Sequence, residues 1–141
     1  MRRAYLILLS VLVLAVGCAD ERKPEDSEVI QPAPPGHIRA SHILISYAGV
    51  PRTEAVRTKE EAASLAEDIL KRIKAGEDFE VLARRYSDCP TAQQEKSGDL
   101  GFFDKGKMVK PFEDAAFGLE VGEVSEVTET KFGYHIIKRT Q

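Results

Sequence analysis

Two histidines, His42 and His135, stand in segments whose residues alternate as in β-strands, and each is followed by a pair of aliphatic residues. A histidine between apolar neighbours is most often a hydrogen-bonded core residue. If the two strands are central and adjacent, the imidazoles can share a hydrogen bond, which would fix the tautomer of each ring. The pattern therefore allows a proton-handling pair or a purely structural one, and it favours the structural one.

Cys89 is one of two cysteines in the chain, and its thiol has several possible uses. A thiolate could act electrostatically or as a covalent nucleophile, and an unreactive thiol could simply fill space. A metal site built from His42, Cys89 and His135 is a further alternative. These residues are scattered along the chain, and none has a second ligand at the close spacing of common zinc motifs. We therefore expect neither a metal nor another cofactor.

Residues 1–17 have the layout of a secretory signal peptide, in which a pair of arginines precedes an apolar run. The run is shorter than the roughly 20 residues that span a bilayer, which argues against a transmembrane anchor. The segment Leu14–Cys18 resembles the bacterial lipobox, with Ala15 where leucine is more common. We therefore expect cleavage before Cys18 and lipidation of its thiol. A signal peptide that is cleaved without lipidation is the alternative.

Residues 18–36 are rich in acidic residues and proline and predict a lipidated tether that cannot bury a core. The lipid would attach the protein to a membrane outside the cytoplasm. Ala19 after the cysteine favours the outer membrane, facing the periplasm. The net charge of -3 gives no reason to expect nucleic acid as a partner. A monomer is expected.

Residues 37–141 predict a single α+β domain, with 43% hydrophobic and 30% charged residues in the whole chain. Apolar side chains on both faces of the first strand predict that it is central and covered on both sides. The expected element order is β-α-α-β-α-β-β. The expected elements are a strand over 38–47, a helix from the Thr58–Glu61 capping box to Gly76, a helix capped by Asp78, a strand over 98–104, a helix over 111–119, and a hairpin of 124–129 with 134–140.

Five segments of this domain resemble, in order and in spacing, the parvulin-type peptidyl-prolyl cis/trans isomerases. They are Ala40–Ile45, Tyr86–Pro90, Gly98–Phe103 continued by Met108–Phe117, Gly122–Ser125 and Gly133–Lys138. The resemblance implies an FKBP-like fold, a four-stranded antiparallel sheet surrounded by helices. It also implies rotation about X-Pro peptide bonds of unfolded or nascent polypeptides, against a barrier of about 18–20 kcal/mol and without a cofactor.

The resemblance also implies two groups of site residues. The proline-binding residues would be Leu100, Phe103, Met108 and Phe112, and the polar catalytic cluster would be His42, Cys89, Thr130 and His135. Each apolar residue, taken alone, is more readily interpreted as part of the core, and the motif match reverses this interpretation for Met108 and Phe112. Many bacterial members carry aspartate at the position of Cys89. Whether the polar cluster acts in catalysis or only shapes the site is open even within the family.

The sequence leaves alternatives open for the substrate preference and for the function. Some parvulins prefer a phosphorylated residue before proline and use a basic loop after the first strand. Here that loop, residues 48–57, offers only Arg52 and Arg57, with Lys59 just beyond, so a broad or hydrophobic preference is expected. The expected function is isomerisation that assists folding of extracytoplasmic or outer-membrane proteins. The alternative is a parvulin-fold chaperone that binds unfolded segments with little catalysis.

Overall fold

The computed structural model describes residues 32–141. The expected signal peptide (1–17) and the lipid-bearing Cys18 lie outside the described residues, as does most of the expected tether (18–36).

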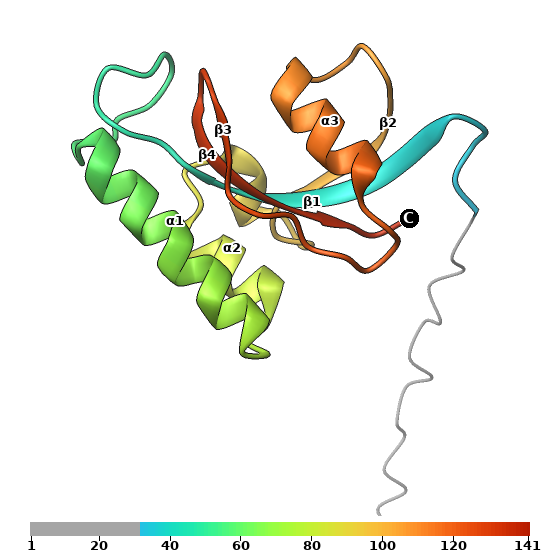
Figure 1. Ribbon diagram of the computed structural model, residues 1–141, viewed down its shortest axis with the longest axis horizontal. Coiled ribbons are helices and arrows are strands. Elements are labelled where there is room, and N and C mark those ends of the chain that lie inside the picture. The colour runs from blue at the N-terminus through green and yellow to red at the C-terminus, as the bar shows by residue number, and fades with distance from the viewer. Residues whose placement is uncertain (1–31) are drawn as a thin grey trace, which may run out of the picture. The chain divides into compact units, whose positions relative to one another are not determined.

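One antiparallel sheet organises the described chain (Figure 1). Its strands, in spatial order, are β2 (Asp99–Asp104), β1 (His37–Ile45), β4 (Gly133–Arg139) and β3 (Thr128–Thr130). The two strands that carry the histidines are therefore neighbours at the centre. The α+β class and the four-stranded antiparallel sheet are as the sequence predicts.

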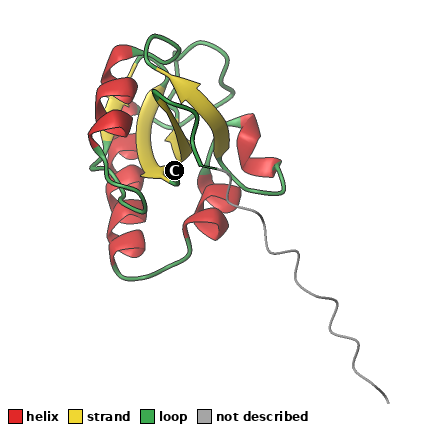
Figure 2. Ribbon diagram, turned by 90° about the vertical axis from the view of Figure 1, so that its right-hand side faces the viewer, coloured by secondary structure: helices red, strands yellow, loops and turns green. Residues whose placement is uncertain are grey.

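Helices cover both faces of this sheet (Figures 1 and 2). They are α1 (Lys59–Lys74), α2 (Phe79–Tyr86) and α3 (Lys110–Gly118), with a short 3₁₀ helix, η1 (Pro90–Gln93), after α2. The capping box at Thr58 is present, with the Thr58 hydroxyl and the Glu61 carboxylate each accepting a backbone N–H of the other residue. Asp78 caps α2 by accepting from Val81 N. The predicted order is confirmed, and η1 is the addition.

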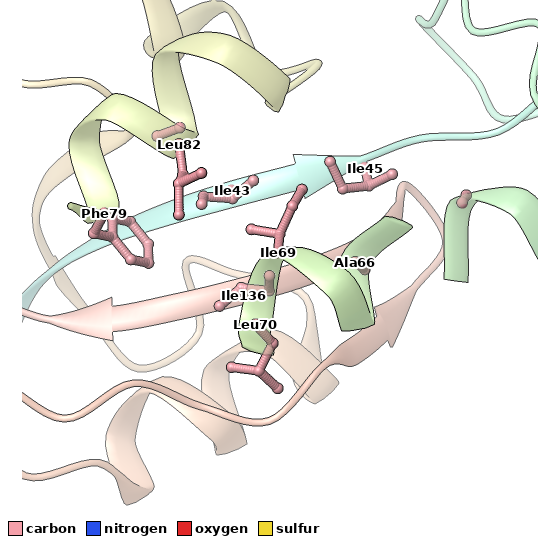
Figure 3. Packing of buried hydrophobic residues seen from close by; sticks show 10 residues of the cluster. Ile43, Ile45, Ala66, Ile69, Leu70, Phe79, Leu82 and Ile136 are labelled. Atoms are coloured by element: carbon pink, nitrogen blue, oxygen red, sulfur yellow. The ribbon is translucent and has the colours of Figure 1, made fainter. Parts of the chain in front are cut away.

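The face of the sheet toward α1 and α2 buries the larger apolar cluster (Figure 3). Ile43 and Ile45 of β1 and Ile136 of β4 are fully buried there. The helices contribute Ala62, Ala66, Ile69, Leu70, Phe79, Leu82 and Ala83. Burying one large aliphatic or aromatic side chain contributes about 1.5–3 kcal/mol, so this cluster fixes both helices on the sheet.

The opposite face packs on α3. Ile38 and Ala40 of β1 and Ile137 of β4 are buried against Phe112 and other apolar residues of α3. Strand β1 is thus covered on both sides, as its sequence predicts. The same alternation points His42 toward α3, because His42 shares the face of Ile38 and Ala40.

The closing hairpin is shorter than the sequence predicts. Strand β3 begins only at Thr128, and Val124 contributes a single isolated bridge to Lys138. Between them the Ser125 hydroxyl accepts from Ile137 N and donates to Glu126 O. A side-chain oxygen therefore replaces a backbone carbonyl in the ladder, which interrupts the predicted strand.

Gly98 allows the chain to pass very close to β1. Its φ is +82°, and a Cβ there would lie 2.4 Å from the His42 carbonyl oxygen. Gly98 O accepts from His42 N at 2.9 Å, and Gly98 N donates to Thr91 O at 2.9 Å. Only glycine fits this conformation without strain, and the two hydrogen bonds hold the backbone of His42 in place.

Candidate active site

The two histidines meet on the face of the sheet that α3 covers. His42 lies opposite Ile137 and His135 lies opposite Leu44, so the imidazoles are diagonal neighbours on adjacent strands. Their Nδ1 atoms are 3.2 Å apart, and the rings stack with centroids 5.3 Å apart. Both side chains are buried. The sequence predicts a hydrogen bond between the two imidazoles if their strands are adjacent. The strands are adjacent, and the hydrogen bond is formed.

Thr130 extends this pair into a chain of polar groups. Its Oγ1 lies 2.9 Å from His135 Nε2 and accepts from Phe132 N at 3.1 Å. His42 Nε2, at the other end, is buried and has no hydrogen-bond partner within residues 32–141. A buried N–H without a partner is rarer in proteins than an unpartnered acceptor.

This asymmetry assigns the protons. Nδ1–H of His42 donates to Nδ1 of His135, and Nε2–H of His135 donates to the Thr130 hydroxyl. Nε2 of His42 is then a bare acceptor. The three side chains form a neutral network in which the ring N–H of each histidine points along the chain toward Thr130.

Burial keeps both rings uncharged. It lowers the pKa of His42 to about 4 and, together with the charge that His42 can carry, the pKa of His135 to about 3. Both values lie below the pKa of about 6.5 that histidine has in an unfolded chain. The neutral form therefore contributes stability that is fully present above about pH 6.5 and is lost as the pH falls toward the folded values.

We expect the histidine pair to add no transition to the pH profile of isomerase activity between about pH 6 and pH 8, because neither ring titrates there. The free energy of unfolding should fall by up to about 1.4 kcal/mol per histidine for each pH unit between about 6.5 and 4. Denaturant unfolding and activity measured across this range test both statements. An activity transition centred near pH 6.5, or a stability that does not change with acid, would contradict them.

The four apolar site residues lie together on β2, on the loop that follows it and on α3. Phe103 and Phe112 are buried, and Leu100 and Met108 are half-buried against the same cluster. The Phe112 ring lies edge-on to both imidazoles, with centroids 5.7 Å from His42 and 5.2 Å from His135. Phe112 therefore joins the apolar group to the polar network.

Glu113 holds the loop that carries Met108, a function that the sequence analysis missed. Its carboxylate is buried and accepts from Gly106 N. The loop after β2 is thereby tied to the first turn of α3. An acidic residue in a first helical turn is too common to have indicated this contact.

Cys89 lies where the chain leaves α2 and runs along the end of β1. Asp88 N donates to Leu44 O at 2.7 Å, and the Ser87 hydroxyl accepts from Leu44 N at 3.0 Å. The half-buried thiol accepts from the Thr91 hydroxyl at 3.2 Å. The segment that carries the thiol is therefore held beside Leu44, which comes two residues after His42 in β1. Within residues 32–141 no group of three or more His, Cys, Asp or Glu side chains could hold a metal ion.

The geometry agrees with comparisons against known proteins. The family described as "PPIC-type PPIASE domain" matches residues 28–141. The chain belongs to this family, the parvulins. It therefore carries a peptidyl-prolyl cis-trans isomerase domain. Among the described residues, no helix is both long enough and apolar enough to cross a membrane.

Relatives of this parvulin come from two groups. "Foldase protein PrsA" of Geobacillus sp. is 48% identical over 103 residues, which are 73% of this chain and 32% of the relative. "Peptidyl-prolyl cis-trans isomerase Pin1" of Malus domestica is 43% identical over 114 residues, 73% of this chain and 93% of the relative. The chain spans only 25% of the PrsA of Halalkalibacterium halodurans.

Solved structures show the same fold. "Peptidyl-prolyl isomerase ESS1 from Candida albicans" superposes with a TM-score of 0.71 at 41% identity, covering 75% of this chain and 63% of that one. PrsA from Bacillus subtilis superposes with a TM-score of 0.60 at 44% identity, covering 75% of this chain and 35% of that one.

Proposed function

We propose that this protein catalyses cis/trans isomerisation of X-Pro bonds in unfolded or nascent polypeptides outside the cytoplasm. The observation that carries the proposal is the position of Phe112, which touches both imidazoles and also packs in the apolar group. A proline ring and its preceding carbonyl need one apolar surface and one polar surface side by side. Phe112 lies at that junction.

The proposed mechanism relies on positioning and needs no covalent step. The half-buried Leu100 and Met108 grip the proline ring, and Phe103 and Phe112 lie beneath them. Removing water from the carbonyl and favouring the twisted amide over both planar forms lowers the barrier to rotation. The network of His42, His135 and Thr130 keeps a fixed, uncharged polar surface next to this site. Cys89 completes the polar side as an electrostatic partner of the twisted amide.

The ion pairs around the loop 48–57 support a preference for peptides without a phosphorylated residue before proline. Arg57 pairs with Asp88, and Lys59 pairs with Glu129 at 2.6 Å. Within residues 32–141, Arg52 is the one basic residue of this group without an ion-pair partner. A single exposed guanidinium is a weak phosphate site, so peptides with a hydrophobic residue before proline should be turned over at least as well as phosphorylated ones.

A protease-coupled assay with a proline-containing peptide tests the function. Turnover at sub-stoichiometric protein supports an isomerase, and peptide binding without turnover supports the chaperone alternative. A phosphorylated and an unphosphorylated peptide of the same sequence, compared by kcat/KM, test the substrate preference in the same experiment.

We further propose that a lipid on Cys18 attaches the protein to a membrane, the outer membrane facing the periplasm. The lipobox-like sequence before Cys18 supports the lipid, and likeness to the PrsA foldases supports a site of action in protein folding. The proposed tether, residues 18–36, would let the domain reach polypeptides near the lipid surface.

Cys18→Ser is expected to abolish partition into the detergent phase and to leave the isomerase domain folded and active, because the change lies far along the chain from the domain. Cys89→Ser, which removes the other thiol, should still partition with detergent. Fractionation after alkaline washing measures both. A Cys18→Ser protein that remains with the membranes would contradict the lipid anchor.

A further inference from the structure

Arg57 is engaged by two partners at once. Its Nη1 donates to the Ser46 carbonyl at 2.8 Å and to Asp88 Oδ2 at 2.5 Å, and Nη2 lies 3.4 Å from Asp88 Oδ1. The backbone fixes Arg57 as well, because Ala48 N donates to Arg57 O at 2.9 Å and closes the loop 48–57. Figure 1 shows this loop beside the tip of the β3–β4 hairpin.

Asp88 connects this arginine to the segment that carries Cys89. Its Oδ2 also accepts from Ser46 N at 2.8 Å, and its own N–H donates to Leu44 O. Asp88 therefore uses both backbone and side chain to continue the sheet past the end of β1. Cys89 is the next residue, so its position depends on these bonds.

Ser46 connects the same arginine to Thr130. The buried Ser46 hydroxyl donates to Phe132 O at 2.9 Å, and Phe132 N donates to the Thr130 hydroxyl at 3.1 Å. A short path of hydrogen bonds thus runs from Arg57 to the turn between β3 and β4. Thr130 is the partner of His135 in the polar network.

We propose that Arg57, Asp88 and Ser46 form a clasp that positions Cys89 and Thr130 relative to the histidine pair. This inference rests on the proposed function and assigns positioning residues to it. The Arg57 and Asp88 side chains keep 29% and 23% of their exposure. Partly exposed ion pairs contribute little to global stability. The clasp therefore acts on the geometry of two site segments more than on the fold.

The test uses the full-length chain and a pair of carboxamide substitutions. Arg57→Gln and Asp88→Asn should each lower kcat by about tenfold or more, because small displacements of catalytic groups are costly. KM should change by less than about twofold, since Leu100, Met108 and Phe112 lie on other elements. The double variant should be no worse than the worse single variant, because both changes break the same contact.

Two further variants separate positioning from stability. Glu77→Gln breaks an arginine–carboxylate pair of similar length, Arg72 with Glu77 at 2.6 Å, which touches none of the site residues. It should leave kcat unchanged. Arg57→Lys should recover part of kcat, because an ammonium keeps the charge and can donate to both Ser46 O and Asp88 Oδ2, but it lacks the second nitrogen that faces Asp88 Oδ1.

The outcomes are distinct. Full activity in Arg57→Gln, an Arg57→Lys no better than Arg57→Gln, or a loss that only follows the unfolded fraction would each overturn the clasp. If the unaltered protein itself shows no turnover, the proposed function fails. The rate at which iodoacetamide alkylates Cys89 then tests the proposed clasp without an activity measurement. This rate should change at least about threefold in Arg57→Gln and stay constant in Glu77→Gln, if the clasp positions the thiol.

Discussion

Replacing Phe112 by alanine is expected to lower kcat/KM by about a hundredfold or more, the largest loss for any single site residue. Phe112 is 3% exposed and contacts both imidazoles as well as the apolar group of α3. Its removal takes away the surface under the proline ring and opens the histidine network to water. The free energy of unfolding should also fall by about 3–5 kcal/mol, as for other buried phenylalanines.

Phe117→Ala is the matched control for this change. Phe117 lies on the same helix and packs edge-on against Phe103 at 6.0 Å, but no ring contact joins it to either histidine. Its loss should reduce stability and leave kcat/KM of the folded fraction within about threefold. Equal loss of activity in Phe112→Ala and Phe117→Ala, measured at matched folded fraction, would mean that Phe112 acts only through packing.

Met108→Ala gives the cleaner test of the proposed proline surface. Met108 is half-buried, and its side chain lies at the edge of the cluster, so truncation leaves the helices and the sheet in contact. We expect kcat/KM to fall by about tenfold with a loss of stability of at most about 1 kcal/mol. An unchanged kcat/KM would remove Met108 from the proposed site.

The sequence was sufficient for the elements that an apolar pattern or a capping residue marks. Alternation on both faces of β1 predicted a central strand, and the capping residues Thr58 and Asp78 fixed where α1 and α2 begin. It was insufficient where a side chain replaces a backbone partner. The Ser125 hydroxyl interrupts the last hairpin, and nothing in the order of residues distinguishes this serine from one in a regular strand.

The candidate site, like the fold, was predicted from the sequence only in part. Periodicity predicted that His42 and His135 could meet, and family resemblance brought in Thr130 and Cys89. The ion pair of Arg57 with Asp88 joins residues 31 positions apart, each of which has an ordinary interpretation as an exposed loop charge. Long-range pairs of this kind depend on how loops pack, which no local pattern encodes.

Cys89→Ala is expected to lower kcat/KM by about tenfold or more, whereas Cys89→Asp should retain most of the activity. The thiol accepts a hydrogen bond from the Thr91 hydroxyl, and a carboxylate of similar size can accept the same bond. Aspartate also supplies a negative charge at neutral pH. If Cys89 acts electrostatically on the twisted amide, aspartate keeps a polar acceptor of similar size at this place and alanine removes it.

The two other interpretations of Cys89 give different patterns with the same variants. A covalent nucleophile would make Cys89→Asp and Cys89→Ala fail alike, and alkylation of the unaltered protein would abolish turnover in proportion to the thiol modified. A thiol that only fills space would leave Cys89→Ala nearly as active as the unaltered protein and slightly less stable. Because Asp88 and the clasp hold the backbone on one side of this residue, the alanine variant should keep its local fold, and its activity reports on the side chain. Full activity in Cys89→Ala would therefore remove Cys89 from the proposed polar cluster and leave catalysis to Phe112, the half-buried apolar residues and the neutral histidine pair.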